Sequence, residues 1–203
     1  MRVTVIDYKA GNLTSVLKAL RHVGAETVVT DGDLSLVETA ECIVLPGVGH
    51  FAATERLDAT GLTTAIRAAI ARGIPFLGIC VGMQWLYAGS SEAPAQPGLA
   101  HFAEKCTRFS ESTEKVPHVG WNSLEIRPSS RLLAGVEPCE YVYFTHSYKA
   151  PVTADTAATT YYIEPFASAI ERGNVMGVQF HPEKSGATGL KILGNFLKWK
   201  GDE

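Results

Sequence analysis

The chain has 203 residues, of which 46% are hydrophobic and 19% are charged, and its formal net charge is −3. This balance is typical of a globular protein with a sizeable core and excludes a disordered or fibrous chain. Because the sequence has no long basic cluster, no signal-peptide pattern and no apolar run of membrane length, we expect a cytoplasmic protein that binds neither nucleic acid nor a membrane.

Short apolar runs alternate with helix-like patterns from residue 1 to residue 90. Apolar residues recur with a 3.6-residue period from Leu13 to Val23, which predicts a helix. The full pattern predicts strands at Val3–Ile6, Thr27–Val29, Cys42–Leu45 and Phe76–Ile79, and helices at Leu13–Val23, Thr63–Ala71 and from Met83 to Tyr87. Such an order predicts α/β architecture, a doubly wound and mostly parallel sheet with helices on both faces.

The second half of the chain has a different pattern. The segment Ser90 to Gly98 is small, polar and rich in proline, which indicates a surface loop. Strand-like runs follow at Val119–Ile126, Tyr141–Phe144, Thr159–Ile163 and Val175–Phe180, and a last helix is predicted near Leu190–Trp199. We expect these strands to add mixed or antiparallel members to the same sheet, so that residues 1–203 form a single domain.

The four cysteines are widely spaced and form no C-x-x-C motif. This spacing predicts neither a zinc site nor a disulfide framework, and it fits a reducing cytoplasm. Cys42 lies inside a predicted strand and is expected to be structural. Cys106 and Cys139 carry no motif and are expected to be inert.

Cys80 stands in a different setting, the pentapeptide Gly78-Ile79-Cys80-Val81-Gly82 at the end of a predicted strand. This is the thiol counterpart of the G-x-S-x-G nucleophile elbow, a sharp strand-to-helix turn that exposes its central side chain. Glycine is expected at both ends because a Cβ would clash where the two backbone arms approach. The start of a helix would favour the thiolate, and the Val81 N–H would stabilise an oxyanion.

A thiolate nucleophile needs a base, and His181 is the strongest candidate. It follows Val178-Gln179-Phe180, the end of another predicted strand, and precedes Pro182 and Glu183. Residues i and i+2 of an extended chain project to the same side, and proline fixes its own φ, so Glu183 is expected to reach back to the imidazole. Cys80, His181 and Glu183 are therefore predicted to act as a catalytic triad.

A third candidate segment, Leu45-Pro46-Gly47-Val48-Gly49-His50-Phe51, also follows a predicted strand. Its turn could present a second backbone N–H, from Val48 or Gly49, opposite that of Val81. Because it is not G-x-G-x-x-G and no P-loop lysine follows, a nucleotide site is not predicted. We expect no cofactor and no metal.

Together these segments resemble the class I, triad-type glutamine amidotransferases, and within them the glutaminase subunits of imidazole glycerol phosphate synthase. The resemblance covers nearly the whole chain and implies a flavodoxin-like fold. It rests on Asp7-Tyr8-Lys9-Ala10-Gly11-Asn12-Leu13, Pro46-Gly47-Val48-Gly49, Gly78-Ile79-Cys80-Val81-Gly82-Met83-Gln84, Pro117-His118-Val119-Gly120-Trp121-Asn122, Thr145-His146-Ser147-Tyr148 and His181-Pro182-Glu183-Lys184-Ser185.

The resemblance implies a reaction. Cys80 would attack the side-chain amide carbon of L-glutamine, His181 would protonate the departing ammonia, and Glu183 would orient His181. Water would then hydrolyse the thioester to glutamate. The oxyanion hole would come from the backbone of Val48, Gly49 and Val81. Substrate contacts are implied for Gly49, Gln84, His146, Ser147 and Tyr148.

The resemblance also implies a partner. Ammonia released into water would be protonated and lost as a nucleophile, so such a glutaminase is expected to dock on a synthase. The implied partner is a (β/α)₈-barrel cyclase, which forms a heterodimer with the glutaminase and makes imidazole glycerol phosphate and AICAR, an aminoimidazole carboxamide ribotide, in histidine biosynthesis. Candidate interface residues are Asn12, Trp121, Tyr143 and Lys184. For Trp121 and Tyr143, an ordinary core or half-buried strand position is the open alternative.

One departure and three alternatives remain at the level of sequence. The family usually has glycine where this chain has Lys9, so the backbone of the first loop is expected to differ. The alternatives are the glutaminase of another synthase such as pyridoxal phosphate synthase, a free-standing γ-glutamyl or peptide hydrolase, and a non-catalytic docking module on the same fold. All three triad residues are present, which argues against the last.

Overall fold

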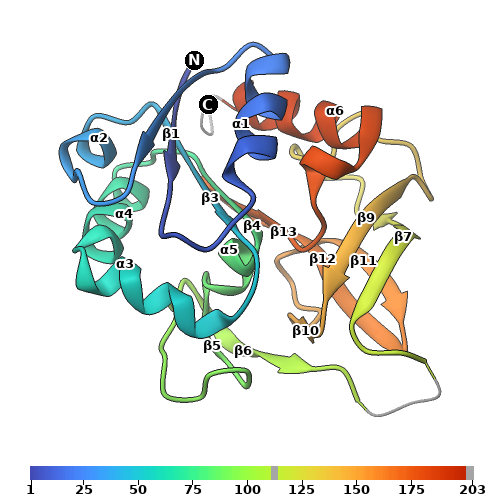
Figure 1. Ribbon diagram of the computed structural model, residues 1–203. Coiled ribbons are helices and arrows are strands. Elements are labelled where there is room, and N and C mark those ends of the chain that lie inside the picture. The colour runs from blue at the N-terminus through green and yellow to red at the C-terminus, as the bar shows by residue number, and fades with distance from the viewer. Residues whose placement is uncertain (111–113, 200–203) are drawn as a thin grey trace.

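The computed structural model describes residues 1–110 and 114–199, and its centre is an eight-stranded sheet (Figure 1). The strands are β1 (Arg2–Ile6), β2 (Glu26–Thr30), β3 (Cys42–Gly47), β4 (Phe76–Cys80), β8 (Glu125–Ile126), β11 (Thr156–Tyr162), β12 (Glu164–Arg172) and β13 (Val175–Val178). Their spatial order is β2-β1-β3-β4-β13-β12-β11-β8. The strands from β2 to β13 run parallel, and β12, β11 and β8 are antiparallel additions.

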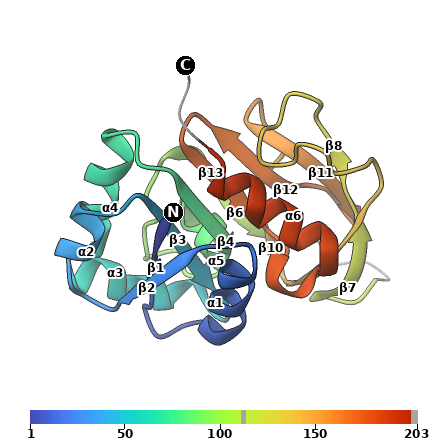
Figure 2. The same ribbon diagram turned by 90° about the horizontal axis from the view of Figure 1, so that it is seen from above.

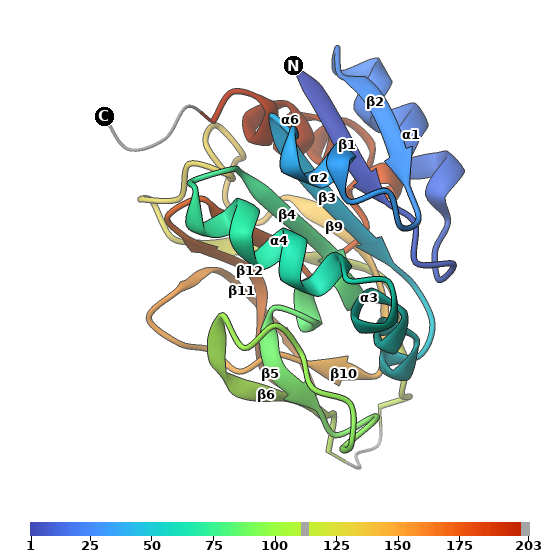
Figure 3. The same cartoon turned by 90° about the vertical axis from the view of Figure 1, so that its left-hand side faces the viewer.

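Helices cover both faces of this sheet, as the doubly wound prediction requires. One face carries α1 (Leu13–His22) and α6 (Gly186–Leu197), which pack against each other (Figure 2). The other carries α2 (Ser35–Glu38), α3 (Glu55–Ala59) and α4 (Leu62–Ala71) (Figure 3). Among the helices of residues 1–110 and 114–199, none combines the length and the apolar character needed to cross a membrane.

The central parallel strands are buried on both faces. Every residue of β3 and β4 is buried, which explains the unbroken apolar runs at Cys42–Leu45 and Phe76–Ile79. The buried backbone N–H and C=O groups of these strands keep their hydrogen bonds, because neighbouring strands pair with one another. The carboxyl ends of β3 and β4 lie side by side, since Gly47 pairs with Cys80 in the register.

Part of the second half forms sheets of its own. A three-stranded sheet contains β5 (Tyr87–Ser90), β6 (Phe102–Arg108) and β10 (Tyr148–Lys149). A two-stranded sheet contains β7 (His118–Ser123) and β9 (Tyr141–His146), with Trp121 opposite Tyr143. The prediction that strands of the second half join the central sheet is therefore confirmed for β8, β11 and β13 and wrong for β7 and β9, whereas β12 was not predicted.

The helix predicted from Met83 to Tyr87 is also wrong in its extent. The helix α5 (Val81–Gln84) is a single turn, and Tyr87 already belongs to β5. Tyr87 pairs with Phe102 of β6, and the two ring centroids lie 5.2 Å apart. This long-range pairing buries both aromatic rings and overrides the local helical pattern.

Two glycines allow β4 to turn sharply into α5. A Cβ on Gly78 would lie 2.5 Å from the carbonyl oxygen of Gly82, so the expected clash between the two arms of the turn is confirmed. A Cβ on Gly82 would lie 1.9 Å from the carbonyl oxygen of Leu45. The obstacle at Gly82 is thus the neighbouring strand β3, which the sequence did not reveal.

We expect Gly82→Ala to lower the free energy of unfolding by roughly 3 kcal/mol or more, because a backbone carbonyl cannot move aside without disturbing β3. The measurement is urea denaturation. Gly194→Ala is the matched control: Gly194 lies within α6, and nothing within 4 Å would meet its Cβ. The control should gain up to about 1 kcal/mol from helix propensity. Equal stabilities of the two variants would contradict this account of the turn.

Candidate active site

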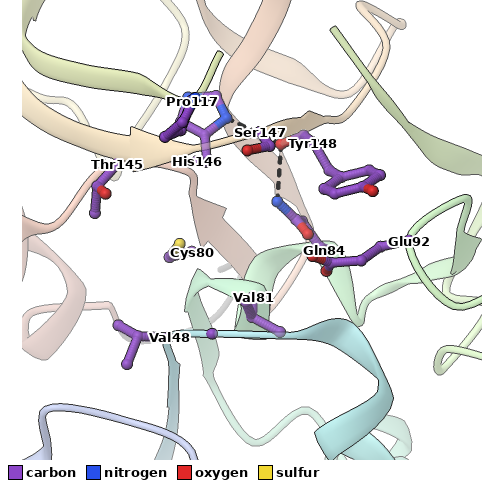
Figure 4. A pocket seen from close by; sticks show the side chains of 11 residues that line it. Val48, Cys80, Val81, Gln84, Glu92, Pro117, Thr145, His146, Ser147 and Tyr148 are labelled. Carbon is purple, nitrogen blue, oxygen red and sulfur yellow. Dashed lines mark hydrogen bonds between the residues drawn. The ribbon is translucent and has the colours of Figure 1, made fainter.

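A pocket of about 260 Å³ opens at the carboxyl ends of β3 and β4, where sites form in open α/β sheets (Figure 4). Its lining includes every residue predicted for the oxyanion hole or for substrate contacts, together with the predicted nucleophile. The lining residues are Val48, Gly49, Cys80, Val81, Gln84, Glu92, Pro117, Thr145, His146, Ser147 and Tyr148.

Cys80 occupies the point where β4 turns into α5. Its backbone has φ 54° and ψ −109°, a conformation that residues other than glycine rarely adopt. Strain of this kind persists where the surrounding structure holds it, as at the elbow of other nucleophiles. Cys80 is 3% exposed, with its sulfur beside the pocket (Figure 4). Because α5 has only four residues, its macrodipole gives the thiolate less help than the sequence predicted.

His181 and Glu183 form the predicted pair. The Nδ1 atom of His181 lies 2.8 Å from Oε1 of Glu183, and the side chains are 1% and 2% exposed. Only His181 is extended, since Pro182–Lys184 forms the 3₁₀ helix η2, so the carboxylate returns through a helical turn. Burial opposes a charge on His181, but the interactions with Cys80 and Glu183 outweigh it and raise the pKa of His181 to about 10.

The other ring nitrogen of His181 is left available. Its Nε2 atom is buried and has no hydrogen-bond partner among the residues described, although Cys80 is close enough to raise the pKa of the ring. The backbone of His181 is held on both sides: its N–H donates to the carbonyl of Tyr143, and its carbonyl accepts from the hydroxyl of Ser185 at 2.6 Å. A fixed imidazole with a free Nε2 can exchange a proton with the neighbouring sulfur.

The backbone N–H of Val48 is already engaged. It donates to the carbonyl oxygen of Ala10, in the loop after β1, at 3.2 Å. This N–H therefore does not serve as an oxyanion donor in the present conformation. Gly49, the next residue, has φ +94°, a conformation open to glycine.

The loop that holds Val48 contains Lys9. Lys9 has φ 62°, in the left-handed region that favours glycine, although it carries a long side chain. Its ammonium bridges Asp7 and Asp31, at 2.9 Å from each carboxylate. These ion pairs raise the pKa of Lys9, first through the hydrogen bond to Asp31.

A pair of neutral histidines, His146 in the pocket wall and His118 next to it, lies at the site. Nδ1 of His118 is 3.3 Å from Nε2 of His146, and Nδ1 of His146 is 2.9 Å from the carbonyl oxygen of Tyr148. The His118 ring stacks between Phe144 and Tyr162, with centroid distances of 4.8 and 4.0 Å. Burial lowers the pKa of His118 to about 4 and that of His146 to about 3, so both are uncharged near neutral pH.

Two polar residues at the site were not predicted, the half-buried Glu92 and the fully buried Gln179. Glu92 lines the pocket, and its Oε2 accepts a hydrogen bond from the N–H of Phe51 at 2.8 Å. Gln179 lies against Cys80, with its Nε2 at 3.6 Å from the sulfur. Glu92 sits in a loop without a motif, so the sequence offered no signal. Gln179 is a lone amide inside an apolar strand end, which was a usable signal.

Three of the four candidate interface residues gather on one surface. The rings of Trp121 and Tyr143 lie 6.1 Å apart, and the Lys184 ammonium is 5.6 Å from the Tyr143 ring. Trp121 is 54% exposed, so the alternative that it is a core or half-buried strand residue is wrong. Tyr143 is half-buried on its strand, as that alternative states. Asn12 is exposed and precedes α1, which packs beside η2.

The histidine pair makes stability depend on pH. Below pH 6.5 the histidines of the unfolded chain bind protons, whereas the buried pair in the folded chain stays neutral. The free energy of unfolding therefore falls as the pH is lowered from about 6.5 to about 4. We expect His118→Phe, which keeps a ring in the stack, to flatten this fall by up to about 1.4 kcal/mol per pH unit. Urea denaturation between pH 7 and pH 4.5 measures it. His22→Phe, at an exposed position of α1, should leave the slope unchanged. A wild-type slope in His118→Phe would contradict the assignment.

Comparison with known proteins agrees with this geometry. The family described as glutamine amidotransferase class-I matches residues 4–199. The chain is 47% identical to imidazole glycerol phosphate synthase subunit HisH of Deinococcus radiodurans, over 97% of this chain and 93% of the relative. It is 43% identical to the protein of the same name in Methanosarcina acetivorans, over 97% and 98%.

Solved structures agree in fold. A crystal structure of a glutamine amidotransferase superposes with a TM-score of 0.76 at 18% identity, covering 97% of each chain. The structure of PurLQS from Thermotoga maritima superposes with a TM-score of 0.73 at 21% identity, again covering 97% of each chain. With a family match over nearly its full length and a cysteine elbow beside a histidine–glutamate pair, the chain belongs to the class I glutamine amidotransferases.

Proposed function

We propose that the chain is the glutaminase subunit of an imidazole glycerol phosphate synthase. It hydrolyses L-glutamine to glutamate and ammonia and passes the ammonia to a cyclase subunit. The observation that carries the proposal is the Cys80 sulfur, which lies between a small pocket and a histidine whose pKa is raised to about 10. The names of the relatives support the choice of this synthase over that of pyridoxal phosphate.

The triad divides the work as follows. The thiol proton of Cys80 passes to Nε2 of His181, and Glu183 stabilises the resulting imidazolium through Nδ1. The thiolate attacks the side-chain amide carbon of glutamine, and His181 returns the proton to the departing nitrogen as the C–N bond breaks. Water activated by His181 then hydrolyses the thioester, which releases glutamate and restores the thiol.

The oxyanion that forms on the amide oxygen is stabilised by the N–H of Val81, with a second donor from Val48 or Gly49. Because the Val48 N–H is bonded to Ala10, a second donor at Val48 requires a rotation of the peptide. One missing donor typically costs about 10²–10³ in rate. With Val48 as the second donor, the chain alone lacks that donor and is a slow glutaminase, and docking of the cyclase is the event that completes the hole.

Recognition of the amino-acid end of glutamine uses the far wall of the pocket. Among the pocket residues that the structure describes, Glu92 is the one carboxylate, and it receives the α-ammonium group. Backbone groups and short polar side chains of His146, Ser147 and Tyr148 bind the α-carboxylate. Gln84 and Gly49 complete the enclosure. This arrangement positions the amide carbon at Cys80.

We expect Glu92→Gln to raise the KM for glutamine roughly tenfold or more with little change in kcat, because it removes a charged hydrogen bond that is equally strong in the ground and transition states. The amide oxygen of the replacement side chain can still accept from the Phe51 N–H, so the loop is retained. Glutaminase assays in the complex measure both constants, and Glu104→Gln, at an exposed position of β6, is the control. A fall in kcat at unchanged KM would contradict this role.

The partner is a (β/α)₈-barrel cyclase that binds the surface formed by Trp121, Tyr143 and Lys184, with Asn12 near its edge. The exposed ring of Trp121 on β7 supports the choice of this surface, since aromatic residues are enriched in interfaces. The phosphorylated substrate belongs to the cyclase. Residues 1–203 act as one glutamine amidotransferase domain, and the heterodimer works in the cytoplasm. No cofactor takes part.

The decisive test separates ammonia production from its use. In the complex with the cyclase, Cys80→Ala should abolish glutamine-dependent synthesis of imidazole glycerol phosphate, because no thioester can form. Synthesis from added ammonium salts should survive, because the cyclase is intact. Cys139→Ala is the control, since Cys139 is exposed and free. Both activities are followed by product chromatography.

Two outcomes would contradict the proposal. Glutamine-dependent synthesis by the Cys80→Ala complex would show that Cys80 is not the nucleophile. Failure of the wild-type chain to bind the cyclase, combined with rapid glutamine hydrolysis by the chain alone, would favour the free-standing hydrolase.

A further inference from the structure

The Cys80 sulfur has a neighbour that the triad does not explain. Gln179 follows β13, which runs parallel to β4, and the pairing of Val178 with Ile79 brings Gln179 beside Cys80. Its Nε2 atom lies 3.6 Å from the sulfur, and the residue is completely buried. Burying an amide is costly unless its donors and acceptor are used. The donors and the acceptor of the buried Gln179 amide must therefore be used by its neighbours.

The direction in which the Gln179 amide points is fixed by a backbone carbonyl. The carbonyl oxygen of Tyr148 can only accept, so the amide of Gln84 must turn its Nε2 toward it, at 2.9 Å (Figure 4). The second hydrogen of the same Nε2 points to Oε1 of Gln179 at 3.0 Å. With its oxygen committed to Gln84, Gln179 has only N–H groups to present to Cys80.

The same carbonyl is fixed from the other side. His146 donates its Nδ1–H to Tyr148, which leaves Nε2 of His146 to accept from His118. Nε2 of His118 then accepts from the amide of Asn122, at 3.4 Å, and Asn122 is oriented by its donation to the carbonyl of Tyr161 at 3.0 Å. From Asn122 through His118 and His146, each group donates toward the carbonyl oxygen of Tyr148. That oxygen therefore accepts from His146 on one side and from Gln84 on the other.

We propose that Gln179 is a further catalytic residue of glutamine hydrolysis: its amide N–H₂ donates to the Cys80 sulfur and favours the thiolate, and Gln84 with the Tyr148 carbonyl holds it in that orientation. The inference rests on the proposed glutaminase function. When the thiol proton moves to His181, the negative charge left on sulfur meets this fixed donor. The bond weakens as sulfur becomes covalently bound to the substrate carbon.

Alkylation of Cys80 by iodoacetamide tests this without glutamine or the cyclase, because the reagent reads out the thiolate directly. The rate at Cys80 is followed by mass spectrometry from pH 5 to pH 10, with exposed Cys139 of the same chain as internal reference. We expect Gln179→Leu to slow Cys80 alkylation at pH 7 roughly tenfold and to move its pH midpoint upward. Gln179→Glu, which places a carboxylate at the sulfur, should slow it more.

Two further variants separate donation from packing. Gln84→Met keeps the length of the side chain but frees the Gln179 amide to rotate, so it should slow Cys80 alkylation by less than Gln179→Leu does. Gln96→Leu, in the loop after β5 and far from the chain of hydrogen bonds, should leave the profile unchanged. In the complex, Gln179→Leu should lower kcat for glutamine with little change in KM, because Gln179 does not line the pocket.

The overturning result is a folded Gln179→Leu chain, with wild-type denaturation behaviour, whose Cys80 alkylates with the wild-type pH profile. If the pH profile of Cys80 alkylation is shifted in Gln179→Leu but unchanged in Gln84→Met, Gln84 does not orient Gln179. Gln179→Asn gives a readout even if leucine destabilises the chain: partial recovery of the alkylation rate relative to Gln179→Leu supports donation, and none contradicts it. An inactive wild-type complex would count against the proposed function and leave these alkylation results standing.

Discussion

The structure depends on the close approach of β3 to the turn between β4 and α5. At Gly82 the carbonyl oxygen of Leu45 occupies the place where any side chain would begin. This contact fixes the distance between the Cys80 elbow and the Val48 turn, because Gly47 and Cys80 are partners in the strand register. The Cys80 elbow and the Val48 turn are therefore positioned by backbone atoms, which no rotamer change can move.

A second constraint is electrostatic and comes from burial. His181, Glu183, Gln179 and Cys80 are all nearly inaccessible, so each charge or dipole acts in a medium of low polarity. The raised pKa of His181 and the lowered pKa values of His118 and His146 follow from what each ring faces. The charged neighbours of His181 make its imidazole a proton acceptor, whereas burial keeps His118 and His146 neutral.

Much of this could be predicted because the signals were local. The parallel half of the sheet follows from apolar runs, and Cys80, His181 and Glu183 sit in short motifs directly after such runs. Their mutual contact could only be expected, since it depends on β13 lying beside β4. The separate β7–β9 sheet and the strand at Tyr87 arise from long-range pairing, which a local pattern does not encode. Likewise, the direction of the Val48 N–H is decided by the carbonyl of Ala10 in a distant loop.

The left-handed backbone of Cys80 has an evolutionary consequence. A conformation of this kind costs about 1–3 kcal/mol for a residue with a Cβ, and glycine would relieve most of it. The position is thus under two opposed pressures, one from folding and one from chemistry. A lineage that no longer needed ammonia from glutamine would gain stability by replacing this cysteine with glycine.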